Sequence, residues 1–204
     1  MNGFCTIPEA IKELQQDHML ILADNPQREN QGDLIFPAKR VTTERVNFMI
    51  QQCRGFVCTP IVQTKAIQLD LPLMVPRDRN TEKTGVNFTI TVDAKNVTSF
   101  GITASDRAKT IELIAGKQTK PNDLVRPGHV LPLLAVKNGL RERQGHTEAS
   151  VEFMRLAGFD QCAVLCEILD NDGEVVRVPT LFDFAEKYKI KLATISDLID
   201  YLKK

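Results

Sequence analysis

The spacing of apolar residues divides the chain into segments that alternate between helical and extended character. Over residues 43–55 the apolar positions fall on one helical face, which predicts an amphipathic helix capped at its end by Gly55. Short apolar runs at residues 19–23 and 34–36 suit buried strands. Residues 88–93 alternate apolar and polar positions, the period of a half-buried strand.

Capping signals predict further helices. Thr6 is followed by a proline and then by Glu9, three residues after the hydroxyl, which is the pattern of a capping box. Thr103 stands in the same relation to Asp106, and Gly116 predicts the end of that helix. Other predicted helices follow the sequence QGHTE at residues 144–148 and begin at Thr180 and Ser196.

The remaining segments predict strands and turns, and together they indicate a fold class. Arg126–His129 contains a Pro-Gly pair and is expected to be irregular. Because strands and helices are interleaved, we expect an α/β or α+β sandwich, with one mixed β-sheet flanked by helices in a single domain. The additional strands are predicted at residues 56–58, 163–169, 175–178 and 192–194, with a hairpin turn at Asp172-Gly173.

Composition and charge exclude several classes of partner. The 204 residues include 26 lysines and arginines and 26 aspartates and glutamates, so no overall charge attracts nucleic acid or an anionic membrane. No apolar run is long enough to cross a bilayer, and the first residues lack the pattern of a signal peptide. The five cysteines form no C-x-x-C pair, which favours reduced thiols and a cytoplasmic location.

Four polar clusters interrupt the apolar pattern: RENQGD at residues 28–33, RPGH at 126–129, RQGHTE at 143–148, and Cys166-Glu167. Each alone has a structural explanation as a turn, a helix start or a solvent-facing strand position. No phosphate loop, dinucleotide-binding motif or G-x-S-x-G motif is present. Chemistry must therefore be sought in the clusters taken together.

Taken together, the clusters supply the groups of a metal-assisted enzyme. One carboxylate and one imidazole suit Mg²⁺ or Mn²⁺ when a substrate provides further oxygens. Arg143, Thr147 and the backbone amides near Gly145, at a predicted helix N-terminus, suit a phosphate. Asp33 and Glu167 are carboxylates that can carry protons. This combination predicts action on a small phosphorylated polyol or sugar.

The order of several long segments is more specific than any one cluster. RENQGDLIF, GFVC, FTITVD, GITASDRAKTIELIA, KPNDLVRPGHVLPL, GHTEASVEFMRLAGF and VLCEILDNDGEVVR together resemble the 3,4-dihydroxy-2-butanone 4-phosphate synthase family. The resemblance extends to SDLIDYLKK and so covers nearly all of residues 1–204. The GTP cyclohydrolase II domain that is fused to some family members is not expected in this chain.

The resemblance implies a lyase of riboflavin biosynthesis. Such an enzyme converts D-ribulose 5-phosphate, with Mg²⁺, into 3,4-dihydroxy-2-butanone 4-phosphate and formate. It also implies an α/β sandwich that works as a homodimer with its active sites near the interface. By matching segments, the expected metal ligands are Glu29 and His146, and the expected catalytic residues are Asp33, His129, Glu167 and Cys58. The expected substrate-binding residues are Arg28, Glu29, Asp33, Arg143, Gln144, Gly145, His146, Thr147 and Glu167.

The loop at residues 23–33 departs from the family pattern. The usual loop reads DDEDRENEGD, whereas this chain reads ADNPQRENQGD, with Asn25, Pro26, Gln27 and Gln31 in place of acids. Glutamine cannot accept a proton near neutral pH, so we expect slow turnover in which Asp33 takes over proton transfer. The alternatives are a paralogue that binds or differently transforms a pentose phosphate, another metal-dependent lyase or isomerase, and a non-catalytic sugar-phosphate-binding module.

Overall fold

A computed structural model of the chain describes residues 3–25 and 27–203. Its centre is one seven-stranded mixed sheet with the strand order β4-β5-β3-β6-β2-β1-β7. The pairs β1–β7 and β3–β5 are parallel, and the other neighbouring pairs are antiparallel. The strands are β1 Leu20–Ala23, β2 Gly32–Pro37, β3 Cys58–Ile61, β4 Val92–Ala94, β5 Leu124–Leu134, β6 Ala163–Glu167 and β7 Lys191–Thr194.

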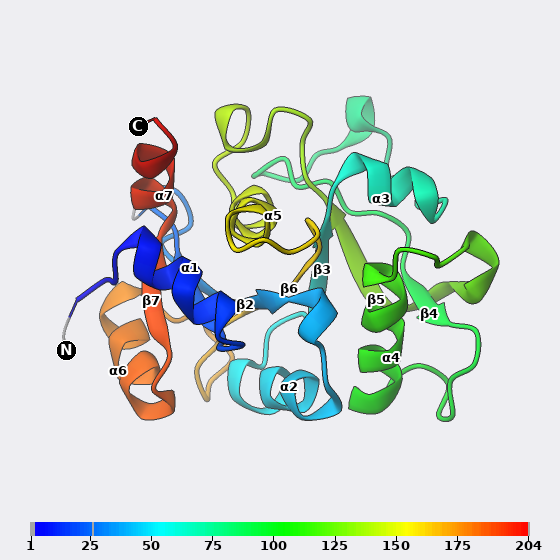
Figure 1. Cartoon of the computed structure of the whole chain (residues 1–204), viewed down its shortest axis with the longest axis horizontal. Coiled ribbons are helices and arrows are strands. Elements are labelled where there is room, and N and C mark those ends of the chain that lie inside the picture. The colour runs from blue at the N-terminus through cyan, green and yellow to red at the C-terminus, as the bar shows by residue number, and fades with distance from the viewer. Residues whose placement is uncertain (1–2, 26, 204) are drawn as a thin grey trace.

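Helices cover both faces of the sheet (Figure 1). On one face, α1, α5 and α7 pack on strand residues such as Leu22, Ile35 and Leu165. On the other face, α2, α4 and α6 pack on Ile21 and Leu34. The prediction of a mixed sheet flanked by helices is therefore confirmed. The helices are α1 Ile7–Gln15, α2 Thr43–Phe48, α3 Gln63–Gln68, α4 Ala104–Ala115, α5 His146–Leu156, α6 Val178–Tyr188 and α7 Ile195–Leu202.

Two of the predicted helix starts have the expected caps. The Thr6 hydroxyl accepts from the Glu9 N–H while the Glu9 carboxylate accepts from the Thr6 N–H, so α1 begins with a capping box. The Thr103 hydroxyl accepts from the Asp106 N–H at 3.2 Å and begins α4. The Asp106 carboxylate, however, accepts from N–H groups of the preceding loop rather than from Thr103.

The predicted helix over residues 43–55 is only partly correct. Its α-helical part, α2, ends at Phe48 and continues as a π-helical segment, Met49–Cys53. The left-handed residue that ends this segment is Arg54, with φ of 64°, and not Gly55. The following strand β3 begins at Cys58 rather than at residue 56, and Phe56 is 53% exposed.

Four other local predictions were only partly correct. Arg126–His129 lies within the long strand β5 but is irregular, as expected. The register with β4 passes from Asp93↔Val125 to Val92↔Val130, so these four residues have no register partner on β4, and the Arg126–Pro127 peptide bond is cis. Residues 88–93 contribute only isolated bridges before β4 begins at Val92. Residues 175–178 form one bridge to Leu169 and no strand. The closing helices begin at Val178 and Ile195, earlier than the predicted Thr180 and Ser196, because Arg177 and Thr194 occupy the cap positions.

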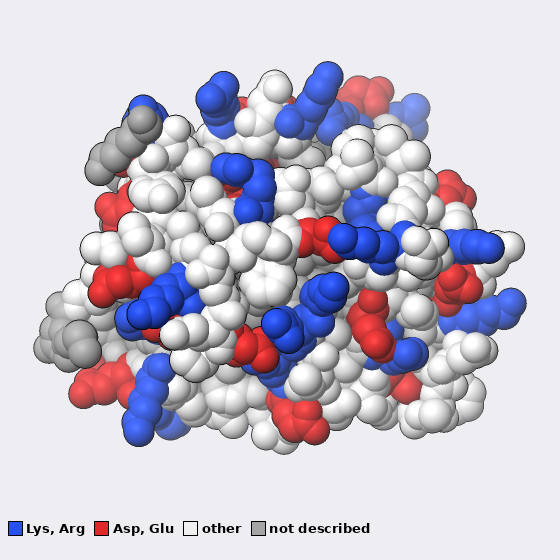
Figure 2. All heavy atoms as spheres, viewed as in Figure 1, with Lys and Arg blue, Asp and Glu red and all other residues white. Residues whose placement is uncertain are grey.

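The surface carries both signs of charge. On the face in Figure 2, lysine and arginine are interspersed with aspartate and glutamate, as the equal totals lead one to expect. All five cysteines are free thiols. Among the described residues, no helix has the length and apolar character that a membrane span requires.

Candidate active site

Strand alternation places a group of polar residues on the sheet face that α5 covers. Asp33 of β2 lies directly opposite Glu167 of β6, and Cys58 of β3 lies opposite Leu165, two residues before Glu167. Residues two apart on a strand share a face, so these side chains project to the same side as Leu165. They border a cavity of about 170 Å³ whose lining is Arg28, Glu29, Gln31, Asp33, Cys58, Glu82, Thr84, Val86, Phe88, Leu133, Arg143, His146, Thr147, Leu165 and Glu167.

The first four residues of RENQGD belong to the connection between the antiparallel strands β1 and β2, and its last two, Gly32 and Asp33, begin β2. The segment is not extended throughout, because Asn30 has φ of 52°. From α6's cap position, Arg177 donates to the carbonyls of Glu29 and Asn30 and fixes the loop from outside. Gln31 and Glu29 both line the cavity, and the predicted substitution at Pro26 lies outside the described residues.

The Glu29 carboxylate receives several partners on a single oxygen. Its Oε2 lies 2.9 Å from Arg28 Nη1, 3.0 Å from Gln31 Nε2 and 3.6 Å from His146 Nδ1. Glu29 Oε1 has no hydrogen-bond or ion-pair partner among the described residues 3–25 and 27–203. Burial alone would raise the pKa of Glu29, but the contacts with His146 and Arg28 lower it, so the carboxylate is ionised at neutral pH.

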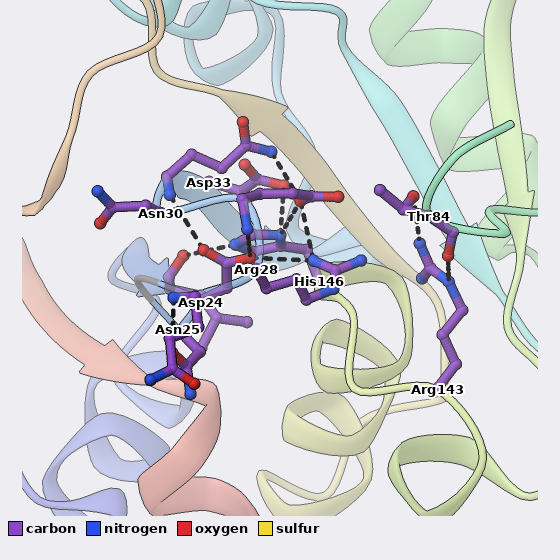
Figure 3. A network of polar contacts seen from close by, with 12 residues as sticks. Asp24, Asn25, Arg28, Asn30, Asp33, Thr84, Arg143 and His146 are labelled. Atoms are coloured by element: carbon purple, nitrogen blue, oxygen red, sulfur yellow. Dashed lines mark hydrogen bonds and ion pairs between the residues drawn. The ribbon is translucent and has the colours of Figure 1, made fainter.

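His146 is oriented as a metal-ligating histidine is. It is the first residue of α5 and is 5% exposed. Its Nε2 donates to the Leu22 carbonyl at 3.1 Å, which directs Nδ1 toward the carboxylates of Glu29 and Asp33 (Figure 3). Nδ1 can hold a proton toward these carboxylates and, once that proton is lost, can bind a cation. Histidines that bind metals commonly donate their other ring N–H to a backbone carbonyl in this way. The donor set therefore fits a divalent cation between His146 and Glu29.

Asp33 is the buried acid of the site. Its Oδ2 lies 3.7 Å from His146 Nδ1, whereas Oδ1 is buried without a hydrogen-bond partner among the described residues. Burial raises the pKa of Asp33 to about 7, with the nearby Glu167, Glu29 and Asp24 acting in the same direction and His146 opposing. Burial would lower the pKa of His146, but the charges of Asp33 and Glu29 raise it overall. Asp33 can thus gain and lose a proton near neutral pH.

Arg143 is held between a loop and the first turn of α5. Its Nε and Nη2 donate to the carbonyl and hydroxyl of Thr84 at 2.9 and 3.1 Å (Figure 3). Its Nη1 lies 2.6 Å from Glu148 Oε2. A Cβ on Gly145 would come within 2.1 Å of Arg143 Nη1, so glycine is needed for this close approach. Arg143 and Thr147 both border the cavity, where a phosphate group has access to charged and N-terminal helix donors.

Glu167 and Cys58 differ in their chemical capacity. Glu167 Oε2 accepts from the Phe56 N–H at 2.9 Å, and a Cβ on Gly55 would lie 2.3 Å from the Glu167 carbonyl oxygen. Burial, followed by the charges of Glu167 and Asp33, raises the pKa of the Cys58 thiol well above its ordinary value. Cys58 is therefore a neutral wall of the cavity at physiological pH rather than a thiolate.

Three of the expected site residues, His129, Gln144 and Gly145, are not part of the described lining of the cavity. The described lining of the cavity does not include His129, which precedes Leu133 by four residues, or roughly 13 Å, along β5. Instead, His129 Nδ1 lies 2.7 Å from Asp93 Oδ2, and its N–H donates to the other oxygen of Asp93. Gln144 is exposed and borders a separate small cavity beside α7.

The structure also brings in residues that the sequence analysis did not assign. One carboxylate oxygen of Asp24 lies within 4.8 Å of a possible ligand atom of Glu29 and of one of His146. Glu82 and Thr84 reach the cavity from the long loop before β4. The acid at the end of the apolar run 19–23 was a usable signal for Asp24. Glu82 and Thr84 carry no such signal, because only the tertiary fold brings their loop to Arg143.

Sequence comparisons agree with the resemblance. The family described as 3,4-dihydroxy-2-butanone 4-phosphate synthase matches residues 8–201. The riboflavin biosynthesis protein RibBA of Aquifex aeolicus is 48% identical over 200 residues, covering 97% of this chain and 49% of that protein. The 3,4-dihydroxy-2-butanone 4-phosphate synthase of Campylobacter jejuni is 46% identical over 198 residues, covering 97% and 58%. The chain spans about half the length of these curated relatives.

Solved structures give the same result. A crystal structure of a 3,4-dihydroxy-2-butanone 4-phosphate synthase in complex with two magnesium ions matches with a TM-score of 0.94 and 37% identity, over 98% of this chain and 97% of that one. The two-domain synthase RibBX from A. baumannii matches with a TM-score of 0.92 and 41% identity, over 97% and 57%. In sequence and in fold, this chain belongs to the 3,4-dihydroxy-2-butanone 4-phosphate synthase family.

Proposed function

We propose that this protein converts D-ribulose 5-phosphate into 3,4-dihydroxy-2-butanone 4-phosphate and formate, a carbon–carbon lyase reaction of riboflavin biosynthesis. The main support is the convergence of Glu29, Asp33 and His146 in one cavity, with Arg143 at its border. The cation is Mg²⁺, with Mn²⁺ as a substitute, because both accept carboxylate and imidazole ligands together with substrate oxygens. The relative with two bound magnesium ions supports this choice.

The proposed cation ligands are Glu29 and His146 Nδ1. When bound, the cation supplies polarisation of the substrate carbonyl and an adjacent hydroxyl, which acidifies the neighbouring C–H. Asp33 is the proposed acceptor of that proton, because its pKa of about 7 suits proton transfer near neutral pH. Glu167 is proposed to exchange protons with substrate hydroxyls during loss of water and release of formate, and its position directly opposite Asp33 in the sheet supports this role.

The phosphate end of the substrate is proposed to bind Arg143 and Thr147. Arg143 offers a forked donor, and Thr147 lies in the first turn of α5, where free backbone N–H groups favour an anion. Because Arg143 already contacts Thr84, the phosphate would share the guanidinium with this loop. Holding the remote end of the substrate fixes its reacting carbons against Asp33 and the cation ligands.

Formate release tests the proposal directly. Purified protein, D-ribulose 5-phosphate and Mg²⁺ are incubated, and formate is measured with a coupled formate dehydrogenase. We expect formate that depends on the cation and is lost in His146→Ala, with no formate from unphosphorylated ribulose. Consumption of the substrate without formate would instead indicate another lyase or isomerase, and binding without turnover would indicate a sugar-phosphate-binding paralogue.

We also propose that the protein acts as a homodimer in the cytoplasm, where its free thiols stay reduced. Support for a dimer comes from His129, which lies outside the cavity, and from an apolar surface near it. Phe100 is 92% exposed with φ of 60°, and Ile102 is 52% exposed. Asp93 lies between His129 and the loop of Phe100. Its carboxylate contacts His129, and it is so close to Gly101 that a Cβ on this neighbour of Phe100 would clash with it. An exposed aromatic residue in a constrained loop is typical of an interface.

The role of His129 can be tested by mixing two inactive variants. If His129 of one copy completes the cavity of the other, dimers of His129→Ala with His146→Ala contain one intact site. Random mixing after dissociation would then restore roughly a quarter of the wild-type activity. If His129 acts within its own chain, no mixed dimer has an intact site and activity is not restored.

A further inference from the structure

Asp24 closes the loop that carries the proposed metal ligand. It follows the last residue of β1, and its side chain is 1% exposed. Its backbone N–H donates to the Gln31 carbonyl at 3.1 Å, and its carboxylate Oδ1 accepts from the Gln31 N–H at 3.0 Å. Asp24 therefore joins the two ends of the loop with backbone and side chain at once.

The second carboxylate oxygen of Asp24 fixes the residues that carry the chemistry. Oδ2 accepts from the Glu29 N–H at 3.1 Å and from Arg28 Nη1 at 3.0 Å. The same Arg28 nitrogen lies 2.9 Å from Glu29 Oε2, so one guanidinium nitrogen bridges the two carboxylates (Figure 3). Asp24 thus determines both where the Glu29 backbone lies and how its side chain turns.

The position of Asp24 admits two roles. One of its oxygens lies within 4.8 Å of atoms of Glu29 and His146, as expected of a third metal ligand. Both oxygens, however, accept N–H donors from the loop, three in all. These donors occupy three of the roughly four lone-pair sites of the carboxylate. A cation on Oδ2 would displace a donor that holds the Glu29 backbone or Arg28, and Oδ1 has a single site left. The hydrogen bonds therefore favour a positioning role over direct ligation.

We propose that Asp24 is a positioning residue of the metal site, holding Glu29 in register with His146 without binding the cation itself. The proposal rests on the proposed metal ligands Glu29 and His146. Outer-shell groups that orient ligands typically change metal affinity by about 10- to 100-fold when they are replaced. Asp24 acts on Glu29 as such a group, through Arg28 and through the loop backbone.

Two substitutions separate the roles. Asp24→Asn places an NH₂ group against at least one loop N–H, so one acceptor is lost and two donors face each other. Asp24→Glu keeps the negative charge and a ligand oxygen, but it moves the acceptors away from the three N–H groups by one methylene. A positioning role predicts that both variants bind cation more weakly, whereas a ligand role predicts that Asp24→Glu retains affinity better than Asp24→Asn.

Asp106 provides a matched control. It is another buried carboxylate that accepts three backbone N–H groups of its own loop, from Thr98, Ser99 and Gly101, at 2.9 to 3.1 Å. Asp106→Asn should lower the unfolding temperature to a similar extent as Asp24→Asn. It should leave cation affinity unchanged, because the described lining of the cavity contains neither Asp106 nor its loop.

The measurement is calorimetric titration of Mg²⁺ into metal-free full-length protein without substrate, alongside thermal unfolding. We expect the dissociation constant to rise about 10-fold or more in Asp24→Asn and in Asp24→Glu, and to stay at the wild-type value in Asp106→Asn. Wild-type affinity in either folded Asp24 variant would overturn the positioning role. If one of them does not fold, the other decides the matter. Absence of Mg²⁺ binding by the wild type, both without substrate and with D-ribulose 5-phosphate present, would instead overturn the proposed metal site, and the role of Asp24 with it.

Discussion

Replacing Asp33 by asparagine should change how the stability of the metal-free protein depends on pH. In the folded state burial raises the pKa of Asp33 from 3.8 to about 7, so the folded protein binds this proton more tightly than the unfolded chain does. The stabilisation is complete below pH 3.8 and is lost as the pH rises through about 7. At about 1.4 kcal/mol for each tenfold change in proton affinity, the loss is on the order of 4 kcal/mol.

Asparagine has the shape of the protonated acid and does not titrate, so Asp33→Asn should lack this loss. The raised pKa of His146 acts in the same direction, and removal of Asp33 reduces that shift as well, since Asp33 is its largest favourable cause. We therefore expect the variant to gain about 2 to 4 kcal/mol on the wild type between pH 4.5 and pH 8.

Urea unfolding at several pH values, with a chelator and a fixed protein concentration, measures this difference. The exposed Asp172→Asn serves as the control, and its stability should follow the wild type at every pH. Parallel stability curves for Asp33→Asn and the wild type would refute the reasoning, because they would mean that Asp33 is ionised in the fold at no special cost.

Three further substitutions test other parts of the site. Arg143→Lys cannot reproduce the forked contacts to Thr84 and Glu148, so KM for ribulose 5-phosphate should rise about 10-fold; an unchanged preference for phosphorylated over unphosphorylated pentuloses would place the phosphate elsewhere. Gln31→Glu restores a proton acceptor 3.0 Å from Glu29 and should raise the steady-state rate of formate release, whereas Asp33→Asn should abolish formate release. An unaltered rate in Gln31→Glu would show that a second carboxylate in the loop is dispensable. Gly55→Ala should destabilise the protein by about 1 to 3 kcal/mol in thermal unfolding and lower kcat, because the new Cβ would lie 2.3 Å from the Glu167 carbonyl oxygen. Gly3→Ala, whose Cβ would have no atom within 4 Å, is the control, and equal stabilities of the two variants would contradict the clash.

Local signals in the sequence were sufficient for much of the fold. The hydroxyl caps and apolar periods act within a few residues, which is why α1, α4 and β1 lie close to their predicted positions. The segments that failed depend on distant partners. Residues 88 and 89 alternate as a strand would but form only isolated bridges, to Leu133 and Leu73. Arg126–His129, by contrast, is an irregular part of β5 without register partners on β4, in keeping with its Pro-Gly pair.

The candidate site, like the fold, could be predicted from the sequence only in part. Glu29, Asp33 and His146 lie in polar clusters that interrupt the apolar pattern, and the residue types of these clusters indicate a metal and a phosphorylated substrate. The resemblance to the family then implies which of the residues are the metal ligands. The orientation of each side chain could not be predicted from the sequence. The Nδ1 of His146 faces Glu29 because Leu22, more than a hundred residues away, accepts from Nε2, and Thr84 reaches Arg143 from a loop with no distinguishing sequence.

The position of β6 in the sheet has a consequence for the order of folding during synthesis. In the order β4-β5-β3-β6-β2-β1-β7, the strand β6 alone joins β3 to β2, although it is made more than a hundred residues after both. Until residues 163–167 leave the ribosome, the hairpin of β1 and β2 and the group of β3, β4 and β5 have no hydrogen-bonded connection through the sheet. His146 contacts β1 directly through Leu22, but the helix α5 that carries it also packs on β3 and β6. A nascent chain that stops before β6 should therefore hold its metal ligands less firmly and bind a cation more weakly than the complete fold.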